Sequence, residues 1–387
     1  MSDQRPDGPQ PRGGILMGRP FGVPVYVTPS WFVVAGLITW LFGGRLADVL
    51  PELGYTRYLV ALSFAVAFYG SVLVHELAHT LVGLHYKLGV RRIQLQFLGG
   101  ISEIEKEAET PGREFWLAFV GPLLSLVLGG GFWLAMRAVE LESVPGVLLA
   151  GLMVSNLVVA AFNLLPGLPL DGGRLLRAAV WKLTGSPMRG TVAAVWAGRA
   201  LAVAVLVGLP MISASRSGVD RTTGEAMLDG VLAAILAFII WNGAGNSLRN
   251  ARLKQVLPEL SVRALARRSI DVPADTPLGE ALRRAHEAQA GAIVVVDGGG
   301  AAIAVVKETA VSAVPEHRRP WIAVSAVARD LEPGLRIPVD LAGEQILDVL
   351  RRAPATEYLV VRPDGSAYGV LALADLERRL TAALTGR

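Results

Sequence analysis

The sequence predicts a membrane protein of about six transmembrane helices with a re-entrant β-hairpin, followed by a cytoplasmic α/β domain. Three observations lead to this fold class. Of the 387 residues 52% are hydrophobic and 18% are charged, with a mean hydropathy of +0.46, a balance that few water-soluble proteins show. Long apolar segments recur between residues 31 and 243. After about residue 250 the composition changes to a soluble pattern that repeats once.

The chain begins with a polar stretch, residues 1–22, that contains Pro and Gly throughout. It lacks the short apolar core and small-residue cleavage site of a removable signal peptide, so we expect an N-terminal cytoplasmic tail. A transmembrane domain is expected over 23–250, because each apolar segment approaches or exceeds the roughly 20 residues needed to cross a hydrocarbon core. The segments are 31–48, 58–84, 114–138, 148–166, 193–214 and 225–243.

The predicted loops differ in their content of Lys and Arg. Most of these residues lie in the tail and in the segments 86–113 and 171–192, on the same side of the membrane as the N-terminus. By the positive-inside rule, we expect a multi-pass protein of the cell membrane with both termini in the cytoplasm.

Composition also excludes several kinds of site. The chain has no cysteine, so disulfides, thiolate metal ligands and thiol nucleophiles are absent, and a metal site must use His, Asp or Glu. The net charge is only +4 despite a pI near 9.5, and no dense basic tract with interleaved aromatic residues occurs. Nucleic-acid binding is therefore not expected.

The fragment HELAH at 75–79 places two imidazoles and a carboxylate inside the second apolar segment. Residues i and i+4 share one face of a helix, so His75 and His79 can present two ring nitrogens to one zinc ion, with Glu76 beside them to deprotonate water. The alternative is buried packing of the histidines against Glu76. Because ionisable groups in a bilayer are costly and persist mainly where they function, the metal site is favoured.

The stretch VRRIQLQFLGGISEIEKE at 90–107 alternates like a pair of strands around Gly99 and Gly100. This pattern is incompatible with a spanning helix. We expect a hairpin that dips into the membrane, and a hairpin wholly in the cytoplasm is the alternative.

Two residues are candidates for a third metal ligand, and the first is His85. It falls where metzincin proteases carry their last histidine, but that motif needs a glycine where this chain has Val82. On an uninterrupted helix, His85 is rotated by about 600° from His79 and points away from the metal face. We therefore expect an interfacial residue at the helix end.

The second candidate is Asp171, in the fragment FNLLPGLPLDGG at 162–173. Its Pro and Gly residues free backbone groups from helical pairing, which a membrane tolerates only inside protein or beside a polar cavity. A carboxylate there can complete a His2Asp site and leave one position for water. Capping of the following helix is the alternative, and the metal ligand is favoured because of HELAH.

The soluble part, 251–387, repeats itself from Ser261 to Leu380: SVRALA recurs as AVSAVA, EALRRA as DVLRRA, and AIVVVDGGG as YLVVRPDGS. It resembles a tandem CBS domain, a module that often binds adenine nucleotides. The second copy keeps Asp375, the residue type that usually holds ribose, but has Ala372 where Ser or Thr is usual, and the first copy lacks both. We expect weak or no adenine-nucleotide binding and a role in docking or homodimerisation.

HExxH in one predicted helix and NxxPxxPLDGG in another resemble the site-2 protease family of intramembrane zinc metalloproteases, in the subgroup with a C-terminal CBS pair. Agreement extends over most of 16–250. GRPFGVPVYVTPSWF (18–32) is similar to the family's approach to its first helix, although Thr28 stands where many members have His. GPLLS matches a small-residue motif in which Gly121 and Ser125 would allow close helix packing.

The resemblance implies the role of each site residue. His75, His79 and Asp171 would hold one zinc ion, and Glu76 would act as the general base. Asn163 would hydrogen-bond the substrate backbone or the developing oxyanion, with plain packing as the alternative.

Substrates would be single-span membrane proteins embedded in lipid, typically regulators such as anti-sigma factors. The hairpin, including Gln96, would pair with unwound substrate by strand addition. The alternative function is a non-proteolytic membrane protein that binds metal or transports ions under CBS control, which would not need Glu76.

Overall fold

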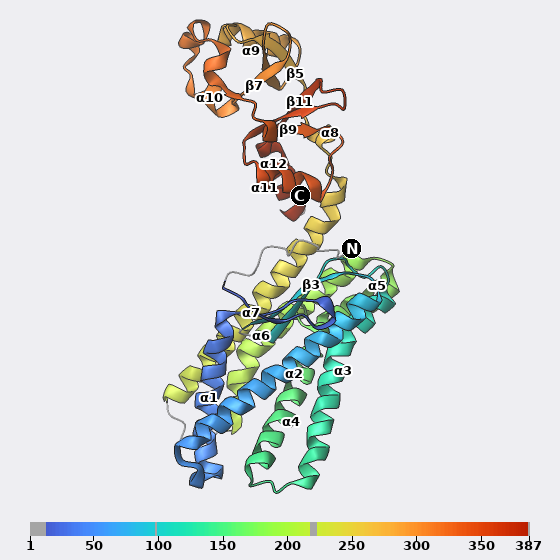
Figure 1. Ribbon diagram of the computed structural model, residues 1–387, viewed down its shortest axis with the longest axis vertical. Helices are drawn as coiled ribbons and strands as arrows, with labels where there is room; N and C mark the ends of the chain where they lie inside the picture. Colours follow the sequence, from blue (N-terminus) through green and yellow to red (C-terminus); the bar gives the residue numbers. More distant parts are fainter. Residues whose placement is uncertain (1–12, 97–98, 217–222, 386–387) are drawn as a thin grey trace. The chain divides into compact units, whose positions relative to one another are not determined.

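The computed structural model describes residues 13–96, 99–216 and 223–385. Residues 1–12 of the expected N-terminal tail and the turn of the expected hairpin at 97–98 lie outside the described residues. The chain divides into two compact units, Met1–Leu248 and Arg249–Arg387 (Figure 1). This division falls close to residue 250, where the composition changes.

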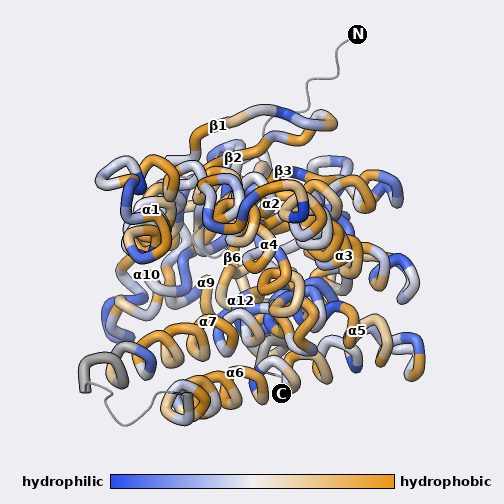
Figure 2. Tube along the Cα trace, turned by 90° about the horizontal axis from the view of Figure 1, so that it is seen from below, coloured by the Kyte–Doolittle hydropathy of each residue, from blue (hydrophilic) through white to orange (hydrophobic). Residues whose placement is uncertain are grey.

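Six helices in the described part of the chain are long and apolar enough to cross a membrane, as the sequence predicts. They are α1 (Pro29–Val49), α2 (Arg57–His85), α3 (Pro111–Ala135), α4 (Val144–Asn163), α6 (Pro187–Arg216) and α7 (Thr223–Val256). Large apolar side chains such as Trp40, Leu59 and Phe238 are exposed, and Figure 2 shows mostly hydrophobic residues along α6. Exposed apolar area of this extent indicates a lipid-facing surface.

Two helices are longer than the apolar pattern predicts. Helix α6 begins at Pro187 rather than at residue 193, and α7 continues to Val256 rather than ending at residue 243. Apolarity marks only the part of a helix that lipid can cover, whereas backbone pairing continues through polar residues until a breaker such as Pro258 approaches. The short helix α5 (Asp171–Thr184) lies between α4 and α6 in the chain and ends at Gly185, whose φ of 69° is the left-handed value that favours glycine.

The predicted hairpin is present as β3 (Val90–Gln96) and β4 (Gly99–Ile104), which pair antiparallel. The hairpin does not stand alone. Residues expected in the tail and in the approach to the first helix form β1 (Ile15–Gly18) and β2 (Val25–Val27), and the four strands make one sheet in the order β1-β2-β3-β4. Buried side chains of β2 and β3 pack against leucines of α2, so one face of the sheet lies on that helix.

The main chain of β3 is hydrogen-bonded on both sides. The Ile93 N–H donates to the Pro24 carbonyl at 2.9 Å, and the Leu95 carbonyl accepts from the Thr28 N–H at 3.1 Å. Ile93 and Leu95 therefore face β2. Because hydrogen-bonding direction alternates along a strand, the main chain of Gln96 faces β4.

The prediction that Gln96 pairs with substrate through its main chain is therefore wrong, because β3 is an interior strand. The free edge of this half of the sheet is β4, since no other strand among the described residues pairs with its outer side. Ile101 lies opposite Gln94 and faces β3. By the same alternation, Gly100 and Ser102 direct their N–H and C=O groups to the free edge.

The C-terminal unit has the organisation predicted for a tandem CBS domain, and we call it the two-repeat unit. The first repeat contains β5 (Ser269–Pro273), α9 (Leu278–Glu287), β6 (Ala292–Val296), β7 (Ala302–Val306) and α10 (Glu308–Ala313). The second contains β9 (Arg336–Pro338), α11 (Glu344–Arg352), β10 (Glu357–Val361), β11 (Ala367–Ala372) and α12 (Leu373–Thr385). The connecting strand β8 (Ala328–Asp330) pairs with β7 of the first repeat. Arg267, which precedes β5, forms a β-bridge to Val370 of β11 in the second repeat, so main-chain pairing joins the two repeats.

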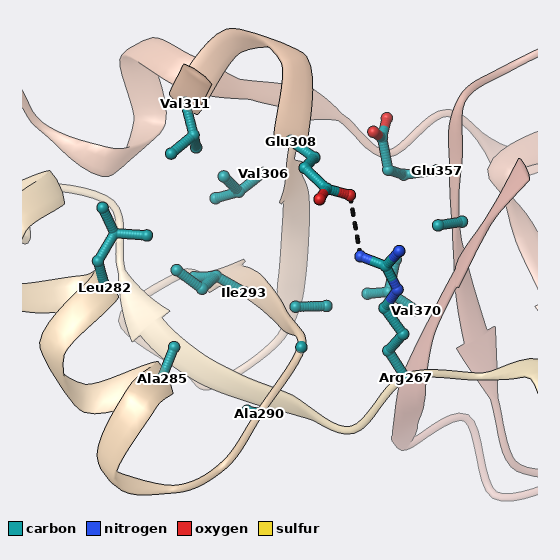
Figure 3. Close-up of a pocket in the computed structure, with 13 residues that line it drawn as sticks. Arg267, Leu282, Ala285, Ala290, Ile293, Val306, Glu308, Val311, Glu357 and Val370 are labelled. Atoms are coloured by element: carbon teal, nitrogen blue, oxygen red, sulfur yellow. Dashed lines mark hydrogen bonds and ion pairs between the residues drawn. The ribbon is translucent and has the colours of Figure 1, made fainter. Parts of the chain in front are cut away.

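A cavity of about 150 Å³ lies between the two repeats. Figure 3 shows apolar side chains such as Ile293 on one side and Arg267 with Glu308 on the other. Arg267 donates from Nε and Nη2 to the Asp375 carboxylate (2.6 and 3.0 Å) and from Nη1 to Glu308 (2.9 Å). The hydrogen bonds from Arg267 hold the pKa of Asp375 below its usual value. Asp375, the residue type that usually holds ribose in such a domain, is thus already paired within the protein.

We expect the full-length protein to bind ATP and AMP weakly or not at all. The cavity is smaller than the pockets of about 300–1,000 Å³ that hold larger ligands, Asp375 is engaged, and Glu308 and Glu357 on the lining would repel phosphates. Calorimetry on detergent-purified protein measures this affinity, and a micromolar Kd would contradict the expectation. The matched variant Arg267→Ala, which frees Asp375, shows whether the ion pair is the obstacle.

Candidate metal centre

Helix α2 places His75 and His79 one turn apart on its buried face. The two residues are 4% and 5% exposed, and their Nε2 atoms lie 3.2 Å apart. Both rings contact α3, which runs alongside α2 (Figure 1). Two imidazoles thus share one small buried volume in a helix long enough to cross a membrane.

Helix α3 holds the other nitrogen of each ring. His79 Nδ1 lies 2.6 Å from the Leu117 carbonyl oxygen, and His75 Nδ1 lies 2.9 Å from Ser125 Oγ. A carbonyl can only accept, so His79 carries its proton on Nδ1 and keeps a lone pair on Nε2. Ser125 can accept from His75 in the same way. Partners of this kind fix the tautomer and orientation of metal-binding histidines.

Gly121 lies between these two partners on α3 and lets the rings approach the helix. A Cβ atom at this position would lie 2.2 Å from His79 Nε2 and 2.7 Å from His75 Nε2. No side chain fits there without moving the rings. The expected close packing at Gly121 and Ser125 is therefore packing against the histidines. Gly121 makes room for both imidazoles, and Ser125 hydrogen-bonds His75.

Asp171 is the first residue of α5 and reaches the same volume. Its Oδ2 atom lies 3.3 Å from His75 Nε2 and 3.2 Å from His79 Nε2. Asp171 thus adds an oxygen donor to the two ring nitrogens.

The segment before Asp171 packs closely against the start of α5, because Gly172 and Gly173 have no side chains that would collide with it. A Cβ at Gly172 would lie 2.3 Å from the Leu165 carbonyl oxygen, and one at Gly173 would lie 2.2 Å from the Leu168 nitrogen. The Leu168 N–H donates to a carbonyl of α6 at 3.1 Å. The Pro- and Gly-rich break expected in the sequence is thus anchored inside protein, as a membrane requires.

The three side chains fit a zinc ion. His75, His79 and Asp171 bring one ligand atom each within 4.8 Å of the others. Tetrahedral zinc with ligand distances of about 2.0–2.2 Å holds neighbouring ligand atoms roughly 3.3–3.5 Å apart, close to the spacing here. Two imidazole lone pairs and a carboxylate that face one another repel unless a cation lies between them.

Glu76 lies next to this cluster but faces the sheet. It is 7% exposed, and its Oε2 atom accepts a hydrogen bond of 2.6 Å from Ser102 Oγ in β4. A Cβ at Gly100 would lie 2.2 Å from Glu76 Cγ. Strand β4 therefore packs directly over the Glu76 carboxylate, which lies outside the set of three ligand residues.

A buried ion-pair cluster that the motifs do not predict joins α3 to α5. Glu114 is 1% exposed and accepts from Arg174 Nε at 3.1 Å and from Arg177 Nη1 at 3.2 Å. Burial would lower the pKa of Arg174, but the Glu114 carboxylate outweighs this and raises it. Because Arg174 follows Asp171 by one turn, the cluster fixes the helix that carries the third ligand. A lone acid in the apolar segment 114–138 is the sequence signal that could have revealed it.

Three residues weighed from the sequence lie outside the cluster. His85 is exposed at the end of α2, with its ring against Tyr86 at 5.2 Å, as the helical rotation predicts. Asn163 ends α4 half-buried, and its side chain has no hydrogen-bond partner within the described residues. Gln96 donates from its side chain to Gln94 at 3.0 Å.

Comparison with known proteins identifies a family. The model of peptidase family M50 matches residues 63–143 and 137–207. Two relatives are named "Putative zinc metalloprotease". The one from Synechocystis sp. is 30% identical over 371 residues and covers 94% of each chain. The other, Rip3 of Mycobacterium tuberculosis, is 35% identical over 243 residues, which are 60% of this chain and 58% of its own.

Solved structures show more distant likenesses. The site-2 protease from Methanocaldococcus jannaschii is 22% identical, covers 61% of this chain and 95% of its own, and has a TM-score of 0.41. The CBS domain of a bacterial CNNM/CorC family Mg²⁺ transporter is 17% identical and covers 43% of this chain and 98% of its own, with a TM-score of 0.28. The family assignment depends on the relative that matches over nearly the whole chain.

Zinc content tests the ligand set. We expect about one zinc per purified chain, as a three-ligand site holds one ion, with large losses in His75→Ala and Asp171→Ala. His85→Ala is the matched control, since it removes an imidazole outside the cluster. Metal analysis by mass spectrometry measures the content. Zinc loss in the His85 variant with normal zinc in the Asp171 variant would reverse the choice of third ligand.

Two glycine substitutions should separate metal binding from hydrolysis. Gly121→Ala places a methyl group against both histidines and should lower zinc content. Gly100→Ala places one against Glu76 and should keep zinc while reducing hydrolysis, because the methyl displaces only Glu76, which we expect to act as the general base. Zinc analysis and a cleavage assay on both variants check this, and equal effects of the two on zinc would be inconsistent with the geometry.

Proposed function

We propose, from the premise that the chain belongs to peptidase family M50, that it is a zinc endopeptidase which hydrolyses peptide bonds inside membrane-spanning segments of other proteins. The observation that carries the proposal is the place of the cluster. His75, Glu76 and His79 lie in a helix long and apolar enough to cross a membrane, where their donor atoms converge with Asp171. A site at that depth is reached by substrates that lie in the bilayer themselves.

The residues of this chain would share the chemistry as follows. His75, His79 and Asp171 hold zinc, which when bound supplies the Lewis acidity that lets water ionise near neutral pH. Glu76 takes a proton from the attacking water and delivers it to the nitrogen of the leaving amine. Asn163, whose amide has no hydrogen-bond partner among the described residues, donates to the substrate carbonyl.

A helical substrate must unwind before water can reach its peptide bonds, and the sheet offers a place for the unwound segment. The outer side of β4 directs the main-chain groups of Gly100 and Ser102 away from β3. Both residues lie against Glu76. An extended segment that adds to this edge would run beside the base, at membrane depth, and would be held through its main chain whatever its sequence.

The alternative function is a non-proteolytic membrane protein that binds metal or transports ions. Such a protein needs the three ligands but no base. Glu76 is buried beside the ligands, and its carboxylate bonds Ser102 rather than joining the ligand set. This arrangement supports hydrolysis.

The protein is a multi-pass membrane protein, and we place it in the cell membrane with both termini in the cytoplasm, because Lys and Arg concentrate in the loops on that side. Cleavage would then occur near the cytoplasmic side of the bilayer. Substrates would be single-span regulators such as anti-sigma factors. The two-repeat unit would regulate the protease or join two copies of it.

Replacing the base tests the proposed function. Co-expression with candidate single-span proteins should show their cleavage by wild type and, with Glu76→Gln, accumulation of uncleaved protein, because loss of a general base slows a reaction by about 100-fold or more. Zinc content should stay normal. Glu140→Gln, at an exposed loop position, is the control. A Glu76 variant that cleaves at the wild-type rate would refute hydrolysis by this site.

Disulfide trapping tests the substrate-binding edge. The chain has no cysteine, so Ile101→Cys introduces a single thiol on β4. Residues opposite Ile101 on an added antiparallel strand would have Cα atoms about 4.5 Å away, within disulfide range. We expect cross-links to a substrate with cysteine near its scissile bond. Ile15→Cys on the opposite edge is the control, since both isoleucines are 52% exposed. Equal trapping at both edges would argue against β4.

A further inference from the structure

We propose that Ser102 is a positioning residue that ties the substrate-binding edge to the base, so that a segment paired with β4 also fixes the Glu76 carboxylate. The inference deepens the proposed function and rests on it. Ser102 lies outside both HELAH and the Asp171 segment. Its side chain would serve proton transfer, and its main chain would serve substrate binding.

The first half is a hydrogen bond to the base. Ser102 Oγ lies 2.6 Å from Glu76 Oε2 and 3.2 Å from the main-chain oxygen of the same residue. A hydroxyl has one proton to donate, and the shorter distance and the negative charge both favour the carboxylate. Within the described residues, Ser102 is the group that donates to this carboxylate. Oε2 is thereby engaged, whereas Oε1 has no hydrogen-bond donor among the described residues.

The second half is the direction of the Ser102 main chain. The side chain points at α2, and the N–H and C=O point to the free edge of β4, because those of Ile101 are used by β3. An added segment would therefore hydrogen-bond the same residue that holds the base. Gly100, two residues before Ser102 on β4, also directs its N–H and C=O to the free edge. Its α-carbon is so close to Glu76 that a Cβ would lie 2.2 Å from Cγ.

Substrate pairing would then act on catalysis through one short path. An edge strand with an open side is free to shift, and main-chain pairing on that side restricts it. Restricting β4 restricts the Ser102 hydroxyl and, through it, the rotation of the Glu76 carboxylate. The base would be best aligned when an extended segment is in place, which favours unwound over helical substrate.

A different role for Ser102 would be to pack the sheet on α2 without influence on the base. Packing predicts that a lost hydroxyl loosens the sheet and weakens substrate binding. Positioning predicts a fall in kcat with little change in KM, because the base is misaligned while the edge remains. The two roles thus differ in which kinetic constant changes.

The test compares Ser102→Ala with Ser102→Thr, which keeps a hydroxyl, and with Ser71→Ala as the matched control. Ser71 is also a buried serine, and its hydroxyl bonds a carbonyl within α2. A designed Leu/Ala single-span peptide with a central Gly-Pro break serves as substrate. We expect Ser102→Ala to lower kcat by about 10- to 100-fold, as misalignment of a catalytic group does, with zinc and KM unchanged and with activity largely restored in Ser102→Thr.

A second measurement needs no turnover. Benzohydroxamate chelates catalytic zinc and donates to a neighbouring carboxylate, so its affinity by calorimetry reports the alignment of Glu76. We expect weaker binding in Ser102→Ala, wild-type affinity in Ser71→Ala, and no further loss when Ser102→Ala is added to Glu76→Asp, whose shorter side chain is beyond reach of the hydroxyl.

The outcomes separate this inference from the proposed function. Suppose that wild type cleaves the substrate. If Ser102→Ala then has the wild-type kcat and hydroxamate affinity, or only a raised KM, the positioning role is refuted and the proposed protease function stands. If wild type neither holds zinc nor binds hydroxamate, the proposed function fails first. Additive losses in the Glu76→Asp background would also overturn the inference, because they would show that Ser102 acts elsewhere.

Discussion

The need to satisfy polar groups inside an apolar helix governs this molecule. Helix α2 carries two imidazoles and a carboxylate in a segment that lipid could otherwise surround, and unpaired polar groups there are costly. Three neighbouring elements supply the partners: α3 bonds both Nδ1 atoms, α5 brings Asp171, and β4 brings Ser102. The arrangement of the membrane unit around α2 follows from this requirement.

Helix α3 connects these partners. Glu114, Leu117, Gly121 and Ser125 lie at spacings of three or four residues and so share one face. Glu114 anchors α5 through Arg174. Leu117 and Ser125 orient the histidines, and Gly121 gives the rings room. Breaking a buried pair such as Glu114 with Arg174 generally costs about 3–5 kcal/mol. Positions that read as ordinary helix packing in the sequence therefore determine where the ligands lie.

The sequence could predict what depends on local pattern. Spacing alone pairs His75 with His79 and excludes His85, and apolar length gives the six spans. It could not predict pairings between distant segments. Strands β1 and β2 are short and lie among Pro and Gly residues, and the parallel contact of β2 with β3 joins residues far apart in the chain. That contact makes β3 an interior strand, so the edge position that the sequence pattern predicts for Gln96 is wrong. Arg267 with Asp375, and Glu114 with Arg174, are long-range pairs of the same kind.

The account depends most directly on the metal between the three ligands. X-ray absorption at the zinc K-edge of purified wild-type protein measures the number and type of ligands without any variant. We predict a low coordination number with two imidazole nitrogens and oxygen ligands from Asp171 and solvent. Three imidazoles, or the six oxygen ligands of a loosely held ion, would contradict the account.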